Sequence, residues 1–152
     1  MKIVLAVVGK ARHPTLGPVI KDYESRAARY WPLAVKEVRE ESAAAPTEVK
    51  RREGERLLAA APVGAHLVAC DEHGSQMTSV QFSAWLQKWR EQAKDLCFLI
   101  GGAHGLSDEV RNAVHTTLAL SDLTLPHEMA RAVFAEQLYR AGTIVKREPY
   151  HK

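Results

Sequence analysis

Apolar residues gather in short uninterrupted runs, and the stretches between these runs repeat their apolar positions at helical spacing. Four runs predict strands, at residues 3–8, 65–70, 96–100 and 117–120. The first run is rich in β-branched side chains, which is typical of a strand covered on both faces of a sheet. A further segment, residues 33–38, alternates apolar and charged side chains and therefore predicts a half-exposed or edge strand.

Helices are predicted between and after these strands, at residues 18–30, 47–61, 108–114 and 128–145 and in the stretch that follows residue 78. Polar residues mark two of the helix starts. Thr78 and Gln81 have the spacing of a capping box, and Ser107 is placed to cap the helix that follows it. Residues 71–76 are predicted to form a loop.

Strands and helices therefore alternate along the whole chain. This order predicts one α/β domain over residues 1–152, built on a mainly parallel sheet with helices on both faces. A length of 152 residues suits a single domain. No repeat or low-complexity tract is present, and "REESAAAP" at residues 39–46 is the most linker-like segment.

Composition narrows the protein class only modestly. Hydrophobic residues make up 46% and charged residues 26%, which indicates a globular protein, and the net charge of +3 is compatible with a polyanionic partner. The apolar runs are far shorter than the ~20 residues that cross a bilayer. Because no cleavage site follows "MKIVLAVVGK", this segment is interpreted as a buried strand of a cytoplasmic protein that has no membrane contact.

Reactive side chains give few independent signals. Cys70 and Cys97 lie at or near the ends of strand-like runs, are not spaced as C-x-x-C, and are predicted to be buried reduced thiols. The histidines are scattered without metal-ligand spacing, so no metal site is predicted. There is also no G-x-S-x-G nucleophile elbow.

Three unusual segments follow predicted strands: "CDEHG", "IGGAHG" and "LSDLTLPHE". In open parallel α/β sheets, ligands bind beyond the carboxyl ends of the strands, so these segments are the candidate site. Gly101, Gly102 and Gly105 let a ligand approach the backbone, and they suggest a cofactor with an adenosine-like or phosphate part. Ala103 breaks the dinucleotide-binding pattern, and an ordinary tight turn is the alternative interpretation.

The segment "LSDLTLPHE" is long for a turn between a strand and a helix, which suggests a backbone wrapped around a ligand. The alternative is a buried connector whose leucines, Leu123 and Leu125, pack in the core. His127 and Arg131 share one face at the start of the last helix, and Tyr150 and His151 lie in the tail. Such side chains can bind phosphate or stack on a base, although a solvated helix face and a frayed tail would look the same.

The segments "KIVLAVVGK", "FLIGGAHGL", "LSDLTLPHEMAR", "AEQLYRAGTI" and "PYHK" occur in the order and spacing of RlmH-type methyltransferases of the SPOUT superfamily. The resemblance runs from the first strand to the last residue. It implies an α/β SPOUT fold whose C-terminal part forms a trefoil knot. It also implies a homodimer with the final helix at the interface and each site built from both subunits.

The resemblance further implies that S-adenosylmethionine is the cofactor. Its pocket would consist of Cys70, Gly101 and the loop residues Leu120, Ser121, Asp122, Leu123, Thr124 and Leu125, beside the glycine turn with Gly102 and Gly105. The implied reaction is methylation of N3 of a pseudouridine in large-subunit (23S) rRNA, on the assembled ribosome.

The catalytic candidates are His127, Arg131, Tyr150 and His151. The three that are not arginine are candidate proton acceptors or base-positioning groups, and the choice among them stays open. Arg131 would bind RNA phosphate or stabilise the developing anion, as would Arg140 and Arg147.

Two departures from the family pattern carry expectations. Cys70 stands where an aliphatic residue is usual, and a thiol is a small hydrophobe that preserves the contact. Gly142 stands where an aromatic residue is common, so it is expected to weaken the continuity of the last helix. Two other interpretations of the chain are a non-catalytic ribosome-binding factor of the same fold and a small α/β enzyme that acts on a nucleotide or another small molecule.

Overall fold

The computed structural model describes residues 1–42 and 45–152, and over these residues strands and helices alternate as predicted. In chain order the elements are β1 (Ile3–Val8), α1 (Leu16–Ala27), β2 (Leu33–Val38), α2 (Pro46–Ala60), β3 (His66–Ser75), α3 (Ser79–Glu91), β4 (Leu96–Ile100), α4 (Asp108–Ala113), β5 (Thr116–Leu118) and α5 (His127–Val145). The strands of this described part form one parallel sheet in the order β2-β1-β4-β3-β5. The predicted parallel α/β architecture is confirmed. Residues 43 and 44 of the linker-like segment lie outside the described residues.

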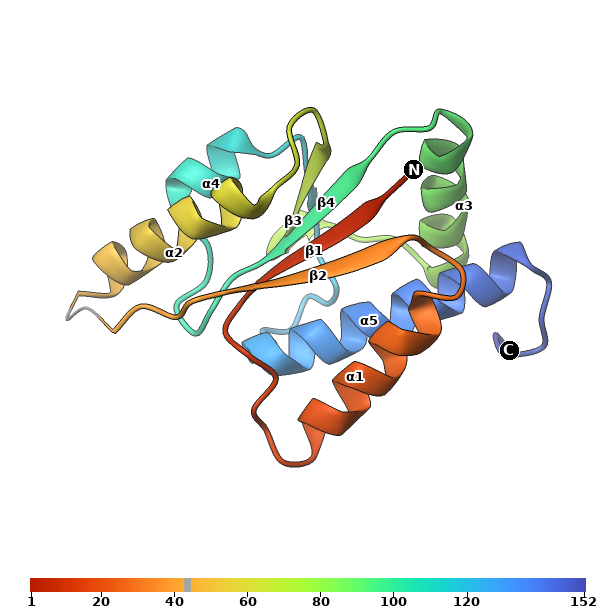
Figure 1. Ribbon diagram of the computed structural model, residues 1–152, viewed down its shortest axis with the longest axis horizontal. Helices are drawn as coiled ribbons and strands as arrows, with labels where there is room; N and C mark the ends of the chain where they lie inside the picture. The colour runs from red at the N-terminus through yellow and green to blue at the C-terminus, as the bar shows by residue number, and fades with distance from the viewer. Residues whose placement is uncertain (43–44) are drawn as a thin grey trace.

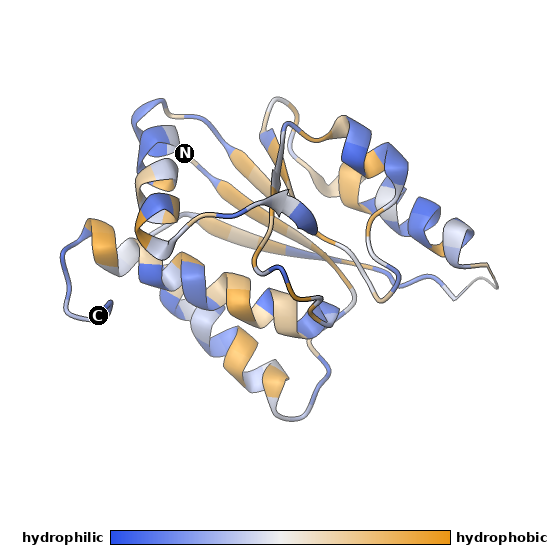
Figure 2. Ribbon diagram, turned by 180° about the vertical axis from the view of Figure 1, so that it is seen from behind, coloured by the Kyte–Doolittle hydropathy of each residue, from blue (hydrophilic) through white to orange (hydrophobic). Residues whose placement is uncertain are grey.

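Helices cover both faces of the sheet, with α1, α3 and α5 on one side and α2 and α4 on the other (Figure 1). Successive residues of β1 face opposite sides, so Ile3 and Leu5 pack toward α5 while Val4 and Ala6 pack toward α2. Every residue of β1 and β4 is buried, and in Figure 2 the strands are mostly hydrophobic while the helices carry both hydrophobic and hydrophilic residues. The continuous apolar runs therefore arise because these strands are covered by helices on both faces of the sheet, as the sequence suggested.

The predicted boundaries are correct for β1, β2 and β4, and β2 is an edge strand as expected. Both predicted caps are confirmed. The Thr78 hydroxyl accepts a hydrogen bond from the Gln81 backbone N–H at 3.1 Å, and the Gln81 side chain accepts one from the Thr78 N–H at 2.8 Å. The Ser107 hydroxyl accepts one from the Val110 N–H at 3.3 Å.

The predicted loop at residues 71–76 is wrong, because β3 continues to Ser75. The strand pairs with β5 on both sides of a register shift between Cys70 and Ser75, and this irregularity hid the second half of the strand from a periodicity argument. The prediction for the last strand was also shifted, since β5 ends at Leu118 and releases Leu120 into the loop that follows.

Gly142 does not interrupt α5, contrary to the expectation from the sequence. The helix continues to Val145, and a methyl group at position 142 would overlap the ring of Tyr30. Glycine is therefore required here by the close packing of Tyr30 against the helix. One turn earlier, the Trp31 indole N–H donates to the Leu138 carbonyl at 2.9 Å, which also fixes α5 to the segment between α1 and β2.

Candidate functional site

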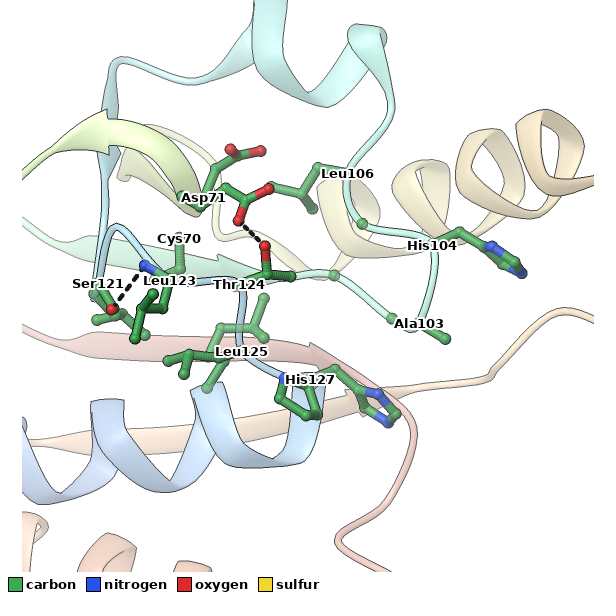
Figure 3. A pocket seen from close by; sticks show the side chains of 18 of the residues that line it. Cys70, Asp71, Ala103, His104, Leu106, Ser121, Leu123, Thr124, Leu125 and His127 are labelled. Atoms are coloured by element: carbon green, nitrogen blue, oxygen red, sulfur yellow. Dashed lines mark hydrogen bonds between the residues drawn. The ribbon is translucent and has the colours of Figure 1, made fainter.

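A cavity of about 580 Å³ opens at the carboxyl ends of β3, β4 and β5 (Figure 3). Its volume is in the range of small-molecule sites, roughly 300–1,000 Å³. Most of the site residues expected from the sequence line it, namely Cys70, Gly101, Gly102, Gly105, Leu120, Ser121, Leu123, Thr124, Leu125 and His127. Asp122 belongs to the same loop but is exposed and does not line the cavity.

The glycine turn forms one wall. The Gly105 N–H donates to the Gly102 carbonyl at 3.0 Å, and Gly105 has a φ of +82°, a conformation that favours glycine. A Cβ at Gly101 would lie 2.9 Å from the backbone of Gly105, so any side chain there would push the two arms of the turn apart. The turn consequently presents bare backbone to the cavity.

The loop between β5 and α5 forms the opposite wall. The Ser121 hydroxyl accepts a hydrogen bond from the Leu123 N–H at 3.0 Å, which tightens the loop, and the Thr124 hydroxyl donates to the Glu72 carboxylate on β3 (Figure 3). Leu123 is 75% exposed although it is a large apolar side chain. An exposed leucine at a cavity rim is suited to cover an apolar ligand surface.

Charged groups hold the base of the cavity. Asp71 accepts hydrogen bonds from Arg111 of α4, with Nη2 at 2.9 Å and Nε at 3.1 Å. Burial alone would raise the pKa of Asp71, but hydrogen bonds from the His73 backbone and ring and from Arg111 hold it below its usual value. The carboxylate therefore stays ionised and ties α4 to β3.

The two thiols are free, as predicted. Burial, with a smaller contribution from the charge of Asp71, raises the pKa of Cys70 to about 12. Cys97 is buried as predicted, and burial raises its pKa to about 11, whereas Cys70 is half-buried at the cavity. At neutral pH, Cys70 therefore contributes an apolar surface to the cavity rather than a nucleophile.

Two imidazoles stand at the cavity rim. His127 begins α5 and His104 lies in the glycine turn, and both project from the same side of the cavity (Figure 3). His127 is the one candidate proton acceptor among the sequence-derived residues that lines the cavity of its own chain.

Arg131 is one turn further along α5 and has other partners. Its side chain is 6% exposed and forms ion pairs with Glu24 of α1 at 2.7 Å and Glu37 of β2 at 2.8 Å. Although burial would lower the pKa of Arg131, hydrogen bonds to both carboxylates keep it raised. The structure thus places this guanidinium in a buried ion-pair network and not at the cavity.

The C-terminal tail folds back against the second half of α5, away from the cavity (Figure 1). The Tyr150 hydroxyl donates to Glu136 at 2.8 Å, and the Arg140 guanidinium lies over the Tyr150 ring and 3.1 Å from Nδ1 of His151. Burial, followed by hydrogen bonds with Tyr23 and Glu136, raises the pKa of Tyr150. Neither Tyr150 nor His151 lines the cavity of this chain.

Several cavity residues were not identified individually from the sequence. Asp71 and Glu72 lie in the "CDEHG" segment, which was expected at the site, but their roles as anchors depend on partners distant in sequence. Arg111 gave no signal at all, because nothing local distinguishes it from an exposed helical arginine, and Leu106 was noted only as the last residue of "FLIGGAHGL".

Within residues 1–42 and 45–152, no three side chains of the metal-binding types are grouped to hold an ion. The helices in the same part of the chain are all too short or too polar to span a bilayer.

Comparison with known proteins gives consistent matches over the whole chain. A family model described as a predicted SPOUT methyltransferase matches residues 1–151. A protein of Gemmatimonas aurantiaca named "Ribosomal RNA large subunit methyltransferase H" is 53% identical, with 100% of both chains covered. A protein of the same name from Trichlorobacter lovleyi is 45% identical, with 99% of both chains covered.

Among solved structures, a probable methylase family protein from Haemophilus influenzae superposes with a TM-score of 0.53 at 13% identity. The superposition covers 99% of this chain and 70% of that chain. At this level of identity the likeness concerns the fold alone.

Proposed function

The chain belongs to the SPOUT methyltransferase family, enzymes that use S-adenosylmethionine, and from this premise we propose that it methylates large-subunit rRNA. The observation that carries the proposal is the cavity between the glycine turn and the loop before α5. Its relatives named as large-subunit rRNA methyltransferases are similar over their full length, which supports the same substrate class. In finer detail, we propose N3 of a pseudouridine on the assembled ribosome as the acceptor.

The residues of the cavity fit S-adenosylmethionine. A Cβ at Gly101 would clash with the Gly105 backbone at 2.9 Å, so the turn presents backbone groups to the cavity, and Leu106 and Leu125 offer apolar surface for a flat heterocycle. We propose that Gly101, Gly102, Gly105, Cys70 and the 120–125 loop hold the cofactor. When bound, the cofactor supplies a methyl group activated by its sulfonium.

The acceptor nitrogen must lose its proton to become nucleophilic. His127 lines the cavity at its rim, where an imidazole nitrogen can accept that proton or orient the base. The loop and the turn keep the two reactants close and exclude water, which reduces the entropic cost of reaching the reactive geometry. Arg131 contributes to the stability of the fold and not to the chemistry, because its ion pairs join α5 to α1 and β2 outside the cavity.

A homodimer accounts for the remaining candidates. The residues of α5 that contact Tyr150 and His151, namely Glu136 and Arg140, lie 9 and 13 residues after His127, so roughly 14–20 Å of helix separates the cavity rim from these two tail residues. These two residues can therefore serve a cavity only if it belongs to a second copy of the chain. We accordingly propose a dimer whose sites each combine the cavity of one chain with the tail of the other.

The same proposal covers the remaining expectations from the sequence. Residues 1–152 form one SPOUT domain whose C-terminal part is threaded as a trefoil knot. The enzyme works in the cytoplasm, where its ribosomal substrate is located.

The test is methyl transfer from labelled S-adenosylmethionine to ribosomes, free subunits and naked rRNA, followed by mapping of the modified nucleotide. Label on a pseudouridine in ribosomes, with little in naked rRNA, is the expected result. Cofactor binding without transfer to any of these substrates would contradict the proposed reaction and favour a non-catalytic ribosome-binding factor.

Mixed dimers test the shared site. Gly101→Ala and Tyr150→Ala chains, each inactive alone, are unfolded and refolded together in equal amounts. Random pairing should restore roughly a quarter of the wild-type activity, because half of the dimers contain one intact site of two. No recovery, with dimers present, would contradict a site built from two chains.

A further inference from the structure

A second hollow lies beside the cavity, at the carboxyl ends of β1 and β2. It is lined by the segment after β1, including Gly9, Lys10 and Arg12, and by residues 37–42 at the end of β2 and beyond it. Because the strands are parallel, it opens on the same edge of the sheet as the cavity. We refer to the surface formed by Lys10, Arg12 and Arg39 as the basic groove.

The acidic residues of this hollow are largely neutralised from within the chain. Glu37 pairs with Arg131 at 2.8 Å, and Glu41 pairs with Arg56 at 2.7 Å. Arg52 adds a second, longer contact to Glu41 at 3.6 Å. These carboxylates therefore contribute little negative potential to a ligand that approaches the hollow.

The cations of the groove lack such partners. Lys10, Arg12 and Arg39 are exposed, and no carboxylate of the described residues lies within 4.0 Å of their charged nitrogens. Two carboxylates near the groove have no ion pair among the described residues: Glu40 lines the hollow, and Glu128 accepts the His13 backbone N–H, so three cations face two carboxylates. The surface is therefore positive, although the net charge of the whole chain is only +3.

The basic groove is fixed to the cavity through α5. The His13 backbone N–H donates to the Glu128 carboxylate at 3.1 Å. His13 Nδ1 in turn accepts hydrogen bonds from the N–H groups of Thr15 and Leu16, both at 3.1 Å, which orders the end of the segment after β1. Glu128 follows His127, the imidazole at the cavity rim, so the groove and the cavity share one rigid support.

We propose that the basic groove binds the RNA backbone phosphates that flank the target nucleotide while the base enters the cavity beside His127. This inference rests on the proposed function and extends it to the residues that hold the substrate. Lysine and arginine are the side chains that bind phosphates, and their contact with RNA phosphates releases cations condensed on the RNA. Internal pairing of Glu37 and Glu41 leaves the groove cations available for that contact.

The experiment compares two triple variants at matched charge. Lys10→Ala/Arg12→Ala/Arg39→Ala removes the groove, whereas Arg29→Ala/Lys88→Ala/Lys94→Ala removes three exposed cations near the amino ends of the strands. Binding to naked large-subunit rRNA and to ribosomes is measured as a function of salt concentration. The affinity for S-adenosylmethionine and the unfolding midpoint are measured in parallel.

The groove variant should bind both RNA probes at least about tenfold more weakly, with a log–log salt slope shallower by roughly 2–3. Its cofactor affinity and midpoint should match wild type, and the control variant should bind RNA normally. A charge-preserving variant, Lys10→Arg/Arg12→Lys/Arg39→Lys, should retain most of the binding.

Three results would overturn the inference. One is unchanged RNA binding and salt slope in the groove variant, and another is an equal loss in the control variant. The third is a loss confined to ribosomes with naked rRNA unaffected, which would indicate a ribosomal protein as the partner. Because these readouts are binding measurements, absence of methyl transfer by the wild type would contradict the proposed function without deciding the role of the groove.

Discussion

Replacement of Arg131 by alanine should unfold the protein at a lower temperature while leaving the assembled site intact. The guanidinium is 6% exposed, and its removal leaves Glu24, which is 12% exposed, without its cation inside the structure. Breaking a buried ion pair by removing one partner costs ~3–5 kcal/mol. Since Glu37 is 33% exposed and can recover some hydration, we expect the lower end, about 3 kcal/mol.

For a chain of this size, 1 kcal/mol shifts the unfolding midpoint by ~2–4 °C, so Arg131→Ala should melt roughly 6–12 °C below wild type. The midpoint of Arg131→Lys should lie between those of Arg131→Ala and wild type, because an ammonium keeps the charge but cannot bridge both carboxylates as the guanidinium does. Thermal unfolding followed by circular dichroism gives the midpoint, and urea titration gives the free energy.

Arg51 supplies a matched control. It also contacts two carboxylates, Glu48 and Glu55, but its side chain is 41% exposed. Water can replace these contacts, so Arg51→Ala should have a much smaller effect than Arg131→Ala. Below the melting range, Arg131→Ala should bind S-adenosylmethionine and methylate ribosomes normally. A variant with the wild-type midpoint that has lost RNA-dependent turnover would refute this reasoning and assign Arg131 to the RNA.

Three further changes test the cavity. Gly101→Ala should weaken S-adenosylmethionine binding at least about tenfold in calorimetric titration, because the new Cβ meets the Gly105 backbone at 2.9 Å. An unchanged affinity would contradict the role of the glycine turn in cofactor binding. Glu53→Gln should leave the unfolding free energy unchanged or raise it by about 1 kcal/mol, because Oε1 of this buried carboxylate has no hydrogen-bond partner in the described structure. A large decrease in the unfolding free energy would contradict this expectation and reveal a partner. The pKa of Asp71 is lowered in the folded state, so its stabilising contribution should be present above its ordinary value of 3.8 and be lost as the pH falls through the folded value. Asp71→Asn should remove this part of the acid sensitivity in urea titrations between pH 6 and 3, and an unchanged pH profile would contradict the assignment.

Local patterns were sufficient to predict most of the fold. Continuous apolar runs located β1 and β4 to the residue, because strands covered on both faces have no polar positions to blur their ends. Cap chemistry at Thr78 and Ser107 located two helix starts, since these hydrogen bonds join residues three apart. The end of β3 was missed because a register shift against β5 breaks the alternation on which the prediction depended.

The candidate site was likewise predictable where topology alone brings segments together, and unpredictable where contacts join residues distant in sequence. Loops at the carboxyl ends of parallel strands must meet at one edge, so the glycine turn and the 120–125 loop could be brought together from topology alone. The partners of Arg131 are 107 and 94 residues away in sequence, and no local spacing distinguishes such an arginine from one that faces solvent. The resemblance to a family could not predict these partners either, because it identifies which residues recur and not what each side chain contacts.

The cavity walls consist mostly of backbone and apolar side chains, and their geometry is set by polar contacts made outside them. Thr124 is attached to Glu72, and Asp71 attaches α4 through Arg111, so the loop before α5 and the helix after the glycine turn are both anchored to β3. Such a design tolerates a thiol at Cys70, since that position only has to present a small apolar surface. It also implies that the residues most sensitive to substitution are the glycines and the anchors. A side chain would clash at Gly101 and Gly102 and would strain the positive φ of Gly105, and removal of an anchor would release a wall. A sequence comparison directed only at cavity-lining side chains would therefore underestimate how much of the chain the site requires.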